Sequence, residues 1–202
     1  MPKRSDLEPN NPLTTTTAYF PPLAWLLAAV RRDEWYWEAH EHYQKGGWRN
    51  RCVIAGANGP LRLTVPLEGG KHQQMPIRDV RISYHGDWQR QHAQAIRSAY
   101  GRAPYFEFYG EALLEVAARP AVFLWDYNLA LIRTVVELLQ LRVAITATDA
   151  FGGADAGAGI PVDGLPPYPQ LFQDRHGFLD GLSVLDGLFC LGPELRLLAH
   201  QR

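Results

Sequence analysis

The feature of this sequence that most restricts its fold is a pair of strand-like segments joined by a very short turn. The segments WRNRCVIAG and LRLTVPLE both alternate polar with apolar residues, and Asn58-Gly59 lies between them. An Asn-Gly pair in this position is a strong β-hairpin signal, because both residues tolerate a positive φ. We therefore predict a hairpin over about residues 48–68, with Asn58 and Gly59 as its loop. Pro60 favours a wider turn, since proline cannot donate the ladder hydrogen bond beside a two-residue loop.

Alternation predicts two unlike faces for this hairpin. The face expected to pack in the core carries Asn50, Cys52, Ile54, Leu61, Leu63, Val65 and Leu67. The opposite face carries Arg49, Arg51, Val53, Arg62, Thr64 and Glu68. The apolar set determines which face is buried. Asn50 is the polar exception. Because an unpaired buried amide costs about 1–3 kcal/mol, Asn50 must either bridge to a neighbouring loop or lie at the floor of a site.

The N-terminal part of the chain predicts a strand, a helix and a second strand, from TTTTAYF, PPLAWLLAAVRR and EWYWEAH. This order favours a parallel βαβ unit. DVRIS and VAITATDAF predict further strands, and segments that begin near Trp88, Pro104 and Val122 predict helices. The expected class is α/β, with a mixed, partly parallel sheet, the hairpin, and helices on both faces.

A length of 202 residues predicts a single domain. Residues 1–13 are polar and predict a flexible arm, and residues 14–202 form the expected domain. Within it, the Gly/Ala/Pro-rich segment 152–167 predicts a flexible loop.

Composition limits the partners and the compartment. A net charge of −1 argues against a nucleic-acid partner. The N-terminal segment lacks the apolar run of a signal peptide, and no stretch of about 18 uninterrupted apolar residues predicts membrane insertion. Two cysteines are too few for a disulfide scaffold. We therefore expect a soluble cytoplasmic protein.

The segment HEHYQKGGWRNRC, residues 40–52, concentrates cationic side chains around a Gly-Gly turn. Arg49 and Arg51 would share one strand face, and Arg62 would approach Arg51 diagonally across the hairpin. An anion bound between them would convert charge repulsion into bidentate, charge-assisted hydrogen bonds. Lys45 would add a point charge. The sequence therefore predicts an anion site at this face.

Tyr43 and Trp48, in the same segment, would supply a stacking wall for the ligand. The alternative for the whole cluster is a solvated strand face with Glu68 as a partial counterion. The two interpretations differ in whether the arginine side chains converge on a ligand or spread into water.

Histidines are the candidate acid–base groups. We predict His42 and His92 as the proton carriers, because imidazoles titrate near neutral pH. For His92 the alternative is a core position, since Trp88, Ile96 and Tyr100 share its side of the predicted helix. His40 and His42 would also point the same way on a strand and could hold a metal. A third ligand is needed, and nothing distinguishes one among His72, His85 and His92, so we assign no metal site.

Familiar catalytic motifs are missing from the sequence: GxxxxGK[ST], GxGxxG, HExxH and GxSxG. Cys52 and Cys190 lie in predicted apolar elements and are expected to be inert packing thiols. The sequence therefore identifies neither a nucleophile nor a cofactor, and it indicates no oligomeric state.

Several segments, in this order along the chain, together resemble the WbqC-like family: YFPP, KGGWRNR, LTVPLE, RISYHGDWQRQHAQAIRSAYGRAPYFEFY and GFLDGLSVLDGLFCLGPE. The resemblance covers about residues 18–198 and is densest from His40 to Tyr109. The family's Lys-x-Gly-Trp-x-Asn-Arg motif is matched at Lys45, Gly47, Trp48, Asn50 and Arg51. Its opening Gln-Pro-Tyr-Phe-x-Pro is matched only from Tyr19 on, since Thr17 and Ala18 replace Gln-Pro. Many members carry an aspartate pair shortly before the lysine, whereas this chain has Ala39 and His40 there.

The resemblance implies a transferase in the biosynthesis of surface polysaccharides of the O-antigen type, and one suggested reaction is aminoacyl transfer to an amino sugar. The expected ligand is an anionic or nucleotide-activated small molecule such as a nucleotide sugar. The YFPP segment is also similar to turns of nucleotide-binding α/β folds that place a phosphate at a helix N-terminus.

The alternative is a non-catalytic module that binds a phosphate-bearing ligand or a partner protein through the same basic hairpin face. Two features favour it: the aspartate pair is replaced, and no nucleophile is evident. Whether the chain is an enzyme therefore stays open at the level of the sequence.

Overall fold

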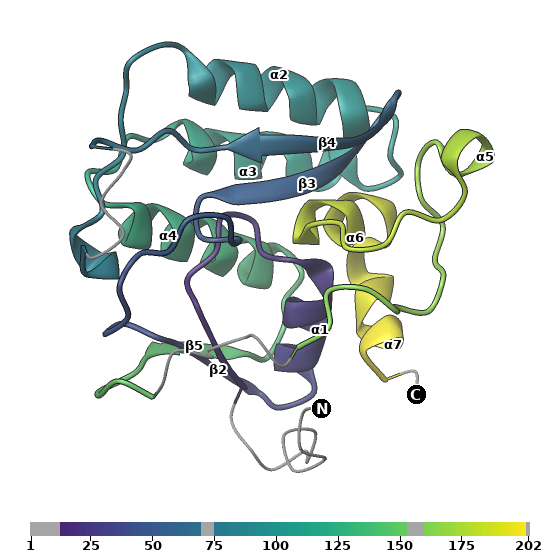
Figure 1. Cartoon of the computed structure of the whole chain (residues 1–202). Helices are drawn as coiled ribbons and strands as arrows, with labels where there is room; N and C mark the ends of the chain where they lie inside the picture. Colours follow the sequence, from purple (N-terminus) through teal and green to yellow (C-terminus); the bar gives the residue numbers. More distant parts are fainter. Residues whose placement is uncertain (1–12, 70–74, 153–159, 201–202) are drawn as a thin grey trace.

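The computed structural model describes residues 13–69, 75–152 and 160–200. Its strands form a three-stranded parallel sheet and a separate two-stranded antiparallel hairpin, with helices packed around both (Figure 1). The predicted α/β class, the parallel strands and the hairpin are therefore confirmed. The predicted arm at 1–13 falls outside the described residues except for its last position, and so does the 153–159 part of the predicted loop.

The predicted βαβ unit consists of β1 (Leu13–Thr15), α1 (Leu23–Val30) and β2 (Glu34–Trp37), and β5 (Ala144–Ala147) extends its sheet. The strand order is β1-β2-β5, and both pairings are parallel. Trp35 and Trp37 point to one face of β2 and are completely buried. On that face the Trp37 ring meets the Trp125 ring of α4 (Leu124–Leu138) edge-on, with centroids 5.8 Å apart.

The hairpin consists of β3 (Arg51–Gly56) and β4 (Gly59–Thr64). Its turn lies one residue earlier than predicted: Gly56 pairs with Gly59, so residues 57 and 58 form the loop. Gly59 takes a φ of +104°, a conformation that favours glycine.

Pro60 explains this shift. In the observed register Pro60 lies opposite Ala55, whose own N–H donates to the hydroxyl of Tyr100 at 3.0 Å. The missing N–H of proline therefore costs little at this position, whereas the predicted register would have needed a donor there. Tyr100 is the last residue of α2 (Trp88–Tyr100), so the same hydrogen bond ties the hairpin to that helix.

The predicted core face of the hairpin is buried at Cys52, Ile54, Leu63 and Val65. Leu61 is 42% exposed, which differs from the prediction. The reason is that α2 and α6 (Val184–Cys190) both lie against β3 rather than against the outer strand β4. In Figure 1 the hairpin lies between these two helices.

The remaining helical elements are α3 (Phe106–Ala118), α5 (Gln173–His176), α7 (Leu195–His200) and the 3₁₀ turns η2 (Ile77–Asp79) and η3 (Gly192–Glu194). The helices predicted to begin near Trp88, Pro104 and Val122 are confirmed. The strand predicted at DVRIS is wrong: Arg81 and Ile82 each form only a single bridge, to Phe123 and Leu67. This segment runs between the end of the hairpin and the start of α4, so it pairs with each of these neighbours through a single residue.

The N-terminus of α1 is covered by the C-terminal part of the chain. The N–H of Leu23 donates to the Leu182 carbonyl at 2.9 Å, and the N–H of Val184 donates to the Pro21 carbonyl at 2.8 Å. All of YFPP is buried. YFPP is expected to resemble turns that place a phosphate at a helix N-terminus. This expectation is wrong, because the backbone around Leu182 covers the N-terminus of α1.

Candidate functional site

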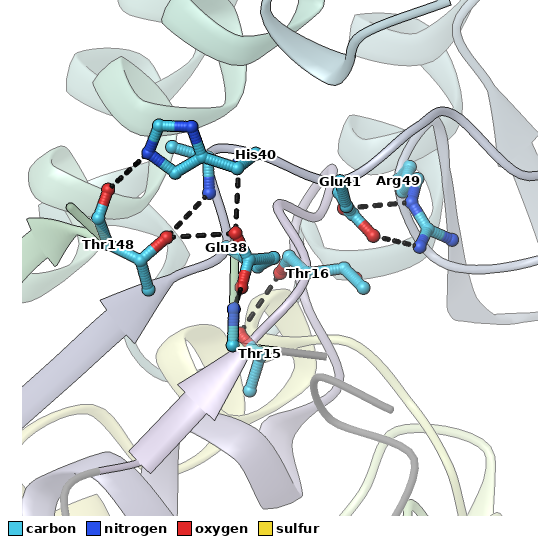
Figure 2. A network of polar contacts seen from close by, with 9 residues as sticks. Thr15, Thr16, Glu38, His40, Glu41, Arg49 and Thr148 are labelled. Carbon is cyan, nitrogen blue, oxygen red and sulfur yellow. Dashed lines mark hydrogen bonds and ion pairs between the residues drawn. The ribbon is translucent and has the colours of Figure 1, made fainter. Parts of the chain in front are cut away.

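Polar side chains gather where the three parallel strands end (Figure 2). Thr16 follows β1, the segment 38–41 follows β2, and Thr148 follows β5. Carboxyl ends of parallel strands meet at one edge of a sheet, which is where open α/β folds place their ligands. Glu38 and Glu41 are both buried at this edge.

Glu38 holds the loops after β2 and β5 together. Its Oε1 accepts hydrogen bonds from the His40 N–H and the Thr148 hydroxyl, both at 2.9 Å, and its Oε2 accepts one from the Gly152 N–H at 2.7 Å. The Thr148 hydroxyl in turn accepts the Ala39 N–H at 3.0 Å. Three donors satisfy the buried carboxylate, as a buried charge requires. Glu38 thereby fixes the backbone on both sides of the edge.

His40 lies in this loop and its side chain is exposed. Its Nε2 is 3.1 Å from the backbone carbonyl of Thr148. Because a carbonyl can only accept, Nε2 carries a proton, and in the neutral imidazole the free lone pair is then on Nδ1. Since β2 ends at Trp37, the expectation that His40 and His42 share a strand face is wrong.

Glu41 and Arg49 form a buried ion pair. The guanidinium of Arg49 donates from Nε to Oε1 at 3.0 Å and from Nη2 to Oε2. Burial raises the pKa of the Glu41 carboxyl, the hydrogen bond and charge of Arg49 oppose that rise, and the nearby charge of Glu38 adds to it. Arg49 was predicted to share a strand face with Arg51, but β3 begins only at Arg51 and the Arg49 side chain turns inward. The Arg49 side chain turns inward because it pairs with Glu41 in the preceding loop.

Three of the predicted cations stay outside this pair. Arg51 is half-buried, and its Nε is buried without a hydrogen-bond partner in the described part of the chain. Arg62 is exposed opposite Val53, which places it diagonally across the ladder from Arg51. Lys45 is exposed in the turn beside Gly46, whose φ is +92°.

Asn50 connects the hairpin to the loop that precedes it. Its Oδ1 accepts a hydrogen bond from the Tyr43 hydroxyl at 3.1 Å, and its Nδ2 donates to the Val65 carbonyl at 2.9 Å. Of the two alternatives predicted for Asn50, the geometry is that of the bridge. Tyr43 is buried by this contact, whereas Trp48 stays half-buried.

The two predicted proton carriers lie in different surroundings. His42 is exposed, and its backbone bridges to Pro76. His92 is buried, with its Nδ1 2.9 Å from the Tyr19 hydroxyl and its ring 5.2 Å from the Trp88 ring. Burial lowers the pKa of His92 to about 4. The geometry of His92 is therefore that of a core histidine, the alternative that the sequence left open.

His72, one of the possible metal ligands, lies outside the described residues. Within residues 13–69, 75–152 and 160–200, no three His, Cys, Asp or Glu side chains lie together as a metal site would require.

Sequence reasoning missed Glu38, Thr148 and Asn128 as members of this region. The Asn128 amide, in α4, donates to the Thr17 hydroxyl at 3.1 Å and to the Arg49 carbonyl at 2.8 Å. Glu38 could have been found, since it is a charged residue near the end of the predicted strand EWYWEAH. Thr148 and Asn128 come from distant parts of the chain and carry no local signal.

The family model described as "WbqC-like protein family" matches residues 17–159 of the chain. No curated protein and no solved structure matches it. In the part of the chain that the structure describes, every helix is too short or too polar to cross a membrane.

Proposed function

The chain belongs to the WbqC-like protein family, and from this premise we propose that it is a transferase of surface-polysaccharide biosynthesis. Its ligand would be an anionic or nucleotide-activated small molecule such as a nucleotide sugar. In aminoacyl transfer to an amino sugar, the reaction that the family resemblance suggests, an activated acyl group would be the donor and a nucleotide-linked amino sugar would be the acceptor.

The observation that carries this proposal is the state of Arg51. The half-buried Arg51 side chain forms no hydrogen bond or ion pair with the described residues, and an anionic ligand would supply the missing acceptor. Lys45 lies in the turn before β3, and Arg62 lies diagonally opposite on β4. Arg51 would therefore form the main charge-assisted bonds to the ligand, with the other two cations in supporting positions.

The predicted neighbours of Arg51 take different roles in this proposal. Arg49 is engaged with Glu41 and would position the backbone that leads into β3. Asn50 and Tyr43 would hold the loop in place through their hydrogen bond, and Trp48, which is half-buried, would contact the ligand.

The test is a thermal-shift panel of sugar nucleotides on the wild-type protein and on Arg51→Ala. A ligand that binds only the folded state raises the melting temperature, and at a given ligand concentration the rise is larger for a smaller dissociation constant. We expect at least one compound to stabilise the wild type and to bind Arg51→Ala about tenfold or more weakly. Arg90→Ala is the control, because Arg90 is exposed and pairs with Asp87 on the surface of α2. Equal stabilisation of wild type and Arg51→Ala would remove Arg51 from the site.

The second candidate is a non-catalytic module that binds a phosphate-bearing ligand or a partner protein through the same face. It is favoured by the geometry of His92, which is packed against Tyr19 and Trp88 in the core. The two candidates differ in product formation. The wild type would be incubated with a binding sugar nucleotide and either a mixture of amine and hydroxyl acceptors or a set of activated aminoacyl donors. Mass spectrometry would then detect a new conjugate only for the transferase.

A further inference from the structure

We infer that the Nδ1 atom of His40 is the base that accepts the proton from the acceptor substrate. This inference rests on the transferase proposal and deepens it. His40 is exposed at the carboxyl edge of the parallel sheet, yet both its backbone and its ring are held by neighbours. A base must have a free lone pair, a fixed orientation and access to substrate, and His40 combines all three.

The ring orientation follows from two contacts. Nε2 donates to the Thr148 carbonyl, and the His40 N–H donates to the Glu38 carboxylate. Glu38 also binds the hydroxyl of Thr148, so one buried carboxylate positions both the histidine and the residue that orients its ring. Such an arrangement selects the tautomer with the free lone pair on Nδ1.

His42, His92 and His85 lack this combination. The His42 ring is exposed and forms no hydrogen bond with the described residues, so its orientation is not fixed. The Nδ1 of His92 lies within hydrogen-bond distance of the buried Tyr19 hydroxyl. The side chain of His85 is exposed. The hydrogen bond of this residue comes from its backbone N–H, which donates to the Ser83 hydroxyl at 3.4 Å, and not from its ring.

His40 belongs to the same segment of the chain as the proposed anion-binding residues. It directly precedes Glu41, whose partner Arg49 leads into Arg51 along the chain. A ligand that contacts both Arg51 and Nδ1 of His40 would span this 38–51 segment.

The proposed step balances without any further reactant. The acceptor's amine or hydroxyl attacks the electrophilic centre of the activated donor, and a new bond to nitrogen or oxygen forms. The bond to the leaving group breaks, and that group departs with the electron pair as an anion that Arg51 and Lys45 would stabilise. The proton of the attacking group moves to Nδ1 of His40.

The first test needs no ligand. Nitrogen-15 NMR of the imidazole groups in the wild-type protein should show His40 protonated at Nε2 and unprotonated at Nδ1. In Glu38→Gln, which keeps the side-chain size, we expect a mixture of tautomers. A wild-type His40 with its proton on Nδ1, or a freely rotating ring, would overturn the inference.

The second test uses turnover of the sugar nucleotide that binds in the thermal-shift panel. In His40→Asn we expect kcat to fall about 10²–10⁴-fold while the affinity for the ligand is unchanged, as for loss of a general base. Added imidazole should restore part of the rate. His85→Asn is the matched control and should keep the wild-type kcat. A wild-type rate in His40→Asn would overturn the role of His40 alone, whereas absence of product from the wild type would overturn the transferase proposal as well.

Discussion

Arg49 and Glu41 form a bidentate ion pair in which each side chain is only 6% exposed. Arg49 stands at the start of the hairpin, and Glu41 stands in the loop after β2. Through its backbone carbonyl Arg49 also accepts the amide of Asn128 in α4. One buried pair therefore joins the parallel sheet, the hairpin and α4.

Removal of one partner should be strongly destabilising. Arg49→Met would leave the Glu41 carboxylate buried without its counterion, and such losses cost about 3–5 kcal/mol. The measurement is the free energy of unfolding in urea at neutral pH. We expect Arg81→Met to cost less than about 1 kcal/mol, because its pair with Glu68 is exposed and such pairs contribute little.

The double variant Arg49→Met, Glu41→Leu provides the control for this interpretation. Replacing both charges by apolar groups of similar size removes the unpaired carboxylate, so we expect it to be more stable than Arg49→Met alone. The free energy of unfolding of Glu41→Leu alone is measured as well. If the double variant is destabilised by the sum of the two single-variant losses, packing and not charge pairing determines the cost.

A second prediction concerns His92 and acid. Burial lowers its pKa to about 4 from an ordinary value of 6.5, so the folded state binds a proton less readily than the unfolded state. The stabilising contribution is present above pH 6.5 and is lost as the pH falls through 4. The shift corresponds to about 3 kcal/mol.

His92→Asn should lose this acid sensitivity, since asparagine does not titrate. Urea unfolding of both proteins between pH 4 and 7 measures the difference. The variant should also keep the response of the wild type to the binding sugar nucleotide, because His92 packs against Tyr19 and Trp88 and not at the sheet edge. Loss of ligand stabilisation in an otherwise folded His92→Asn protein would contradict this placement and return His92 to the site.

The elements with local signals could be predicted from the sequence. The hairpin, the βαβ unit and the helix from Trp88 to Tyr100 follow from turn residues and periodicity, which act over a few positions. The turn register could not be fixed in the same way. The register depends on placing Pro60 where no backbone N–H is needed for a ladder hydrogen bond. It also depends on the Tyr100 hydroxyl of α2, which accepts the Ala55 N–H.

The site was harder to predict for a related reason. Arginines near a Gly-Gly turn indicated an anion site, but the sequence pattern treated Arg49 and Arg51 as equivalent. Their difference comes from Glu41, which lies in a loop without periodicity and captures only one of them. Thr148 orients the ring of His40 across a gap of 108 positions, and no local pattern contains such a contact.

The last prediction concerns Asp186, a completely buried carboxyl in α6. Its Oδ2 accepts a hydrogen bond from the Tyr168 hydroxyl at 2.8 Å, and its Oδ1 lies 4.0 Å from the Cys190 sulfur. Burial raises the pKa of Asp186 to about 6, although hydrogen bonds from Tyr168, Tyr100 and Gln170 oppose the rise. The folded state therefore holds the proton more tightly than the unfolded state does.

The sign of this effect is opposite to that of His92. The contribution of Asp186 is most favourable below pH 3.8 and is lost as the pH rises through about 6, a change of about 3 kcal/mol. Asp186→Asn keeps the size and the acceptor for Tyr168 but removes the titration of residue 186. The pH dependence that remains comes from His92, so the free energy of unfolding of this variant should fall as the pH is lowered from 7 to 4. His92→Asn should show the reverse slope, and the wild type should show a flatter profile than either. Urea unfolding at several pH values measures all three, and a wild-type slope that Asp186→Asn leaves unchanged would show that the Asp186 carboxyl is already ionised in the folded protein at pH 4.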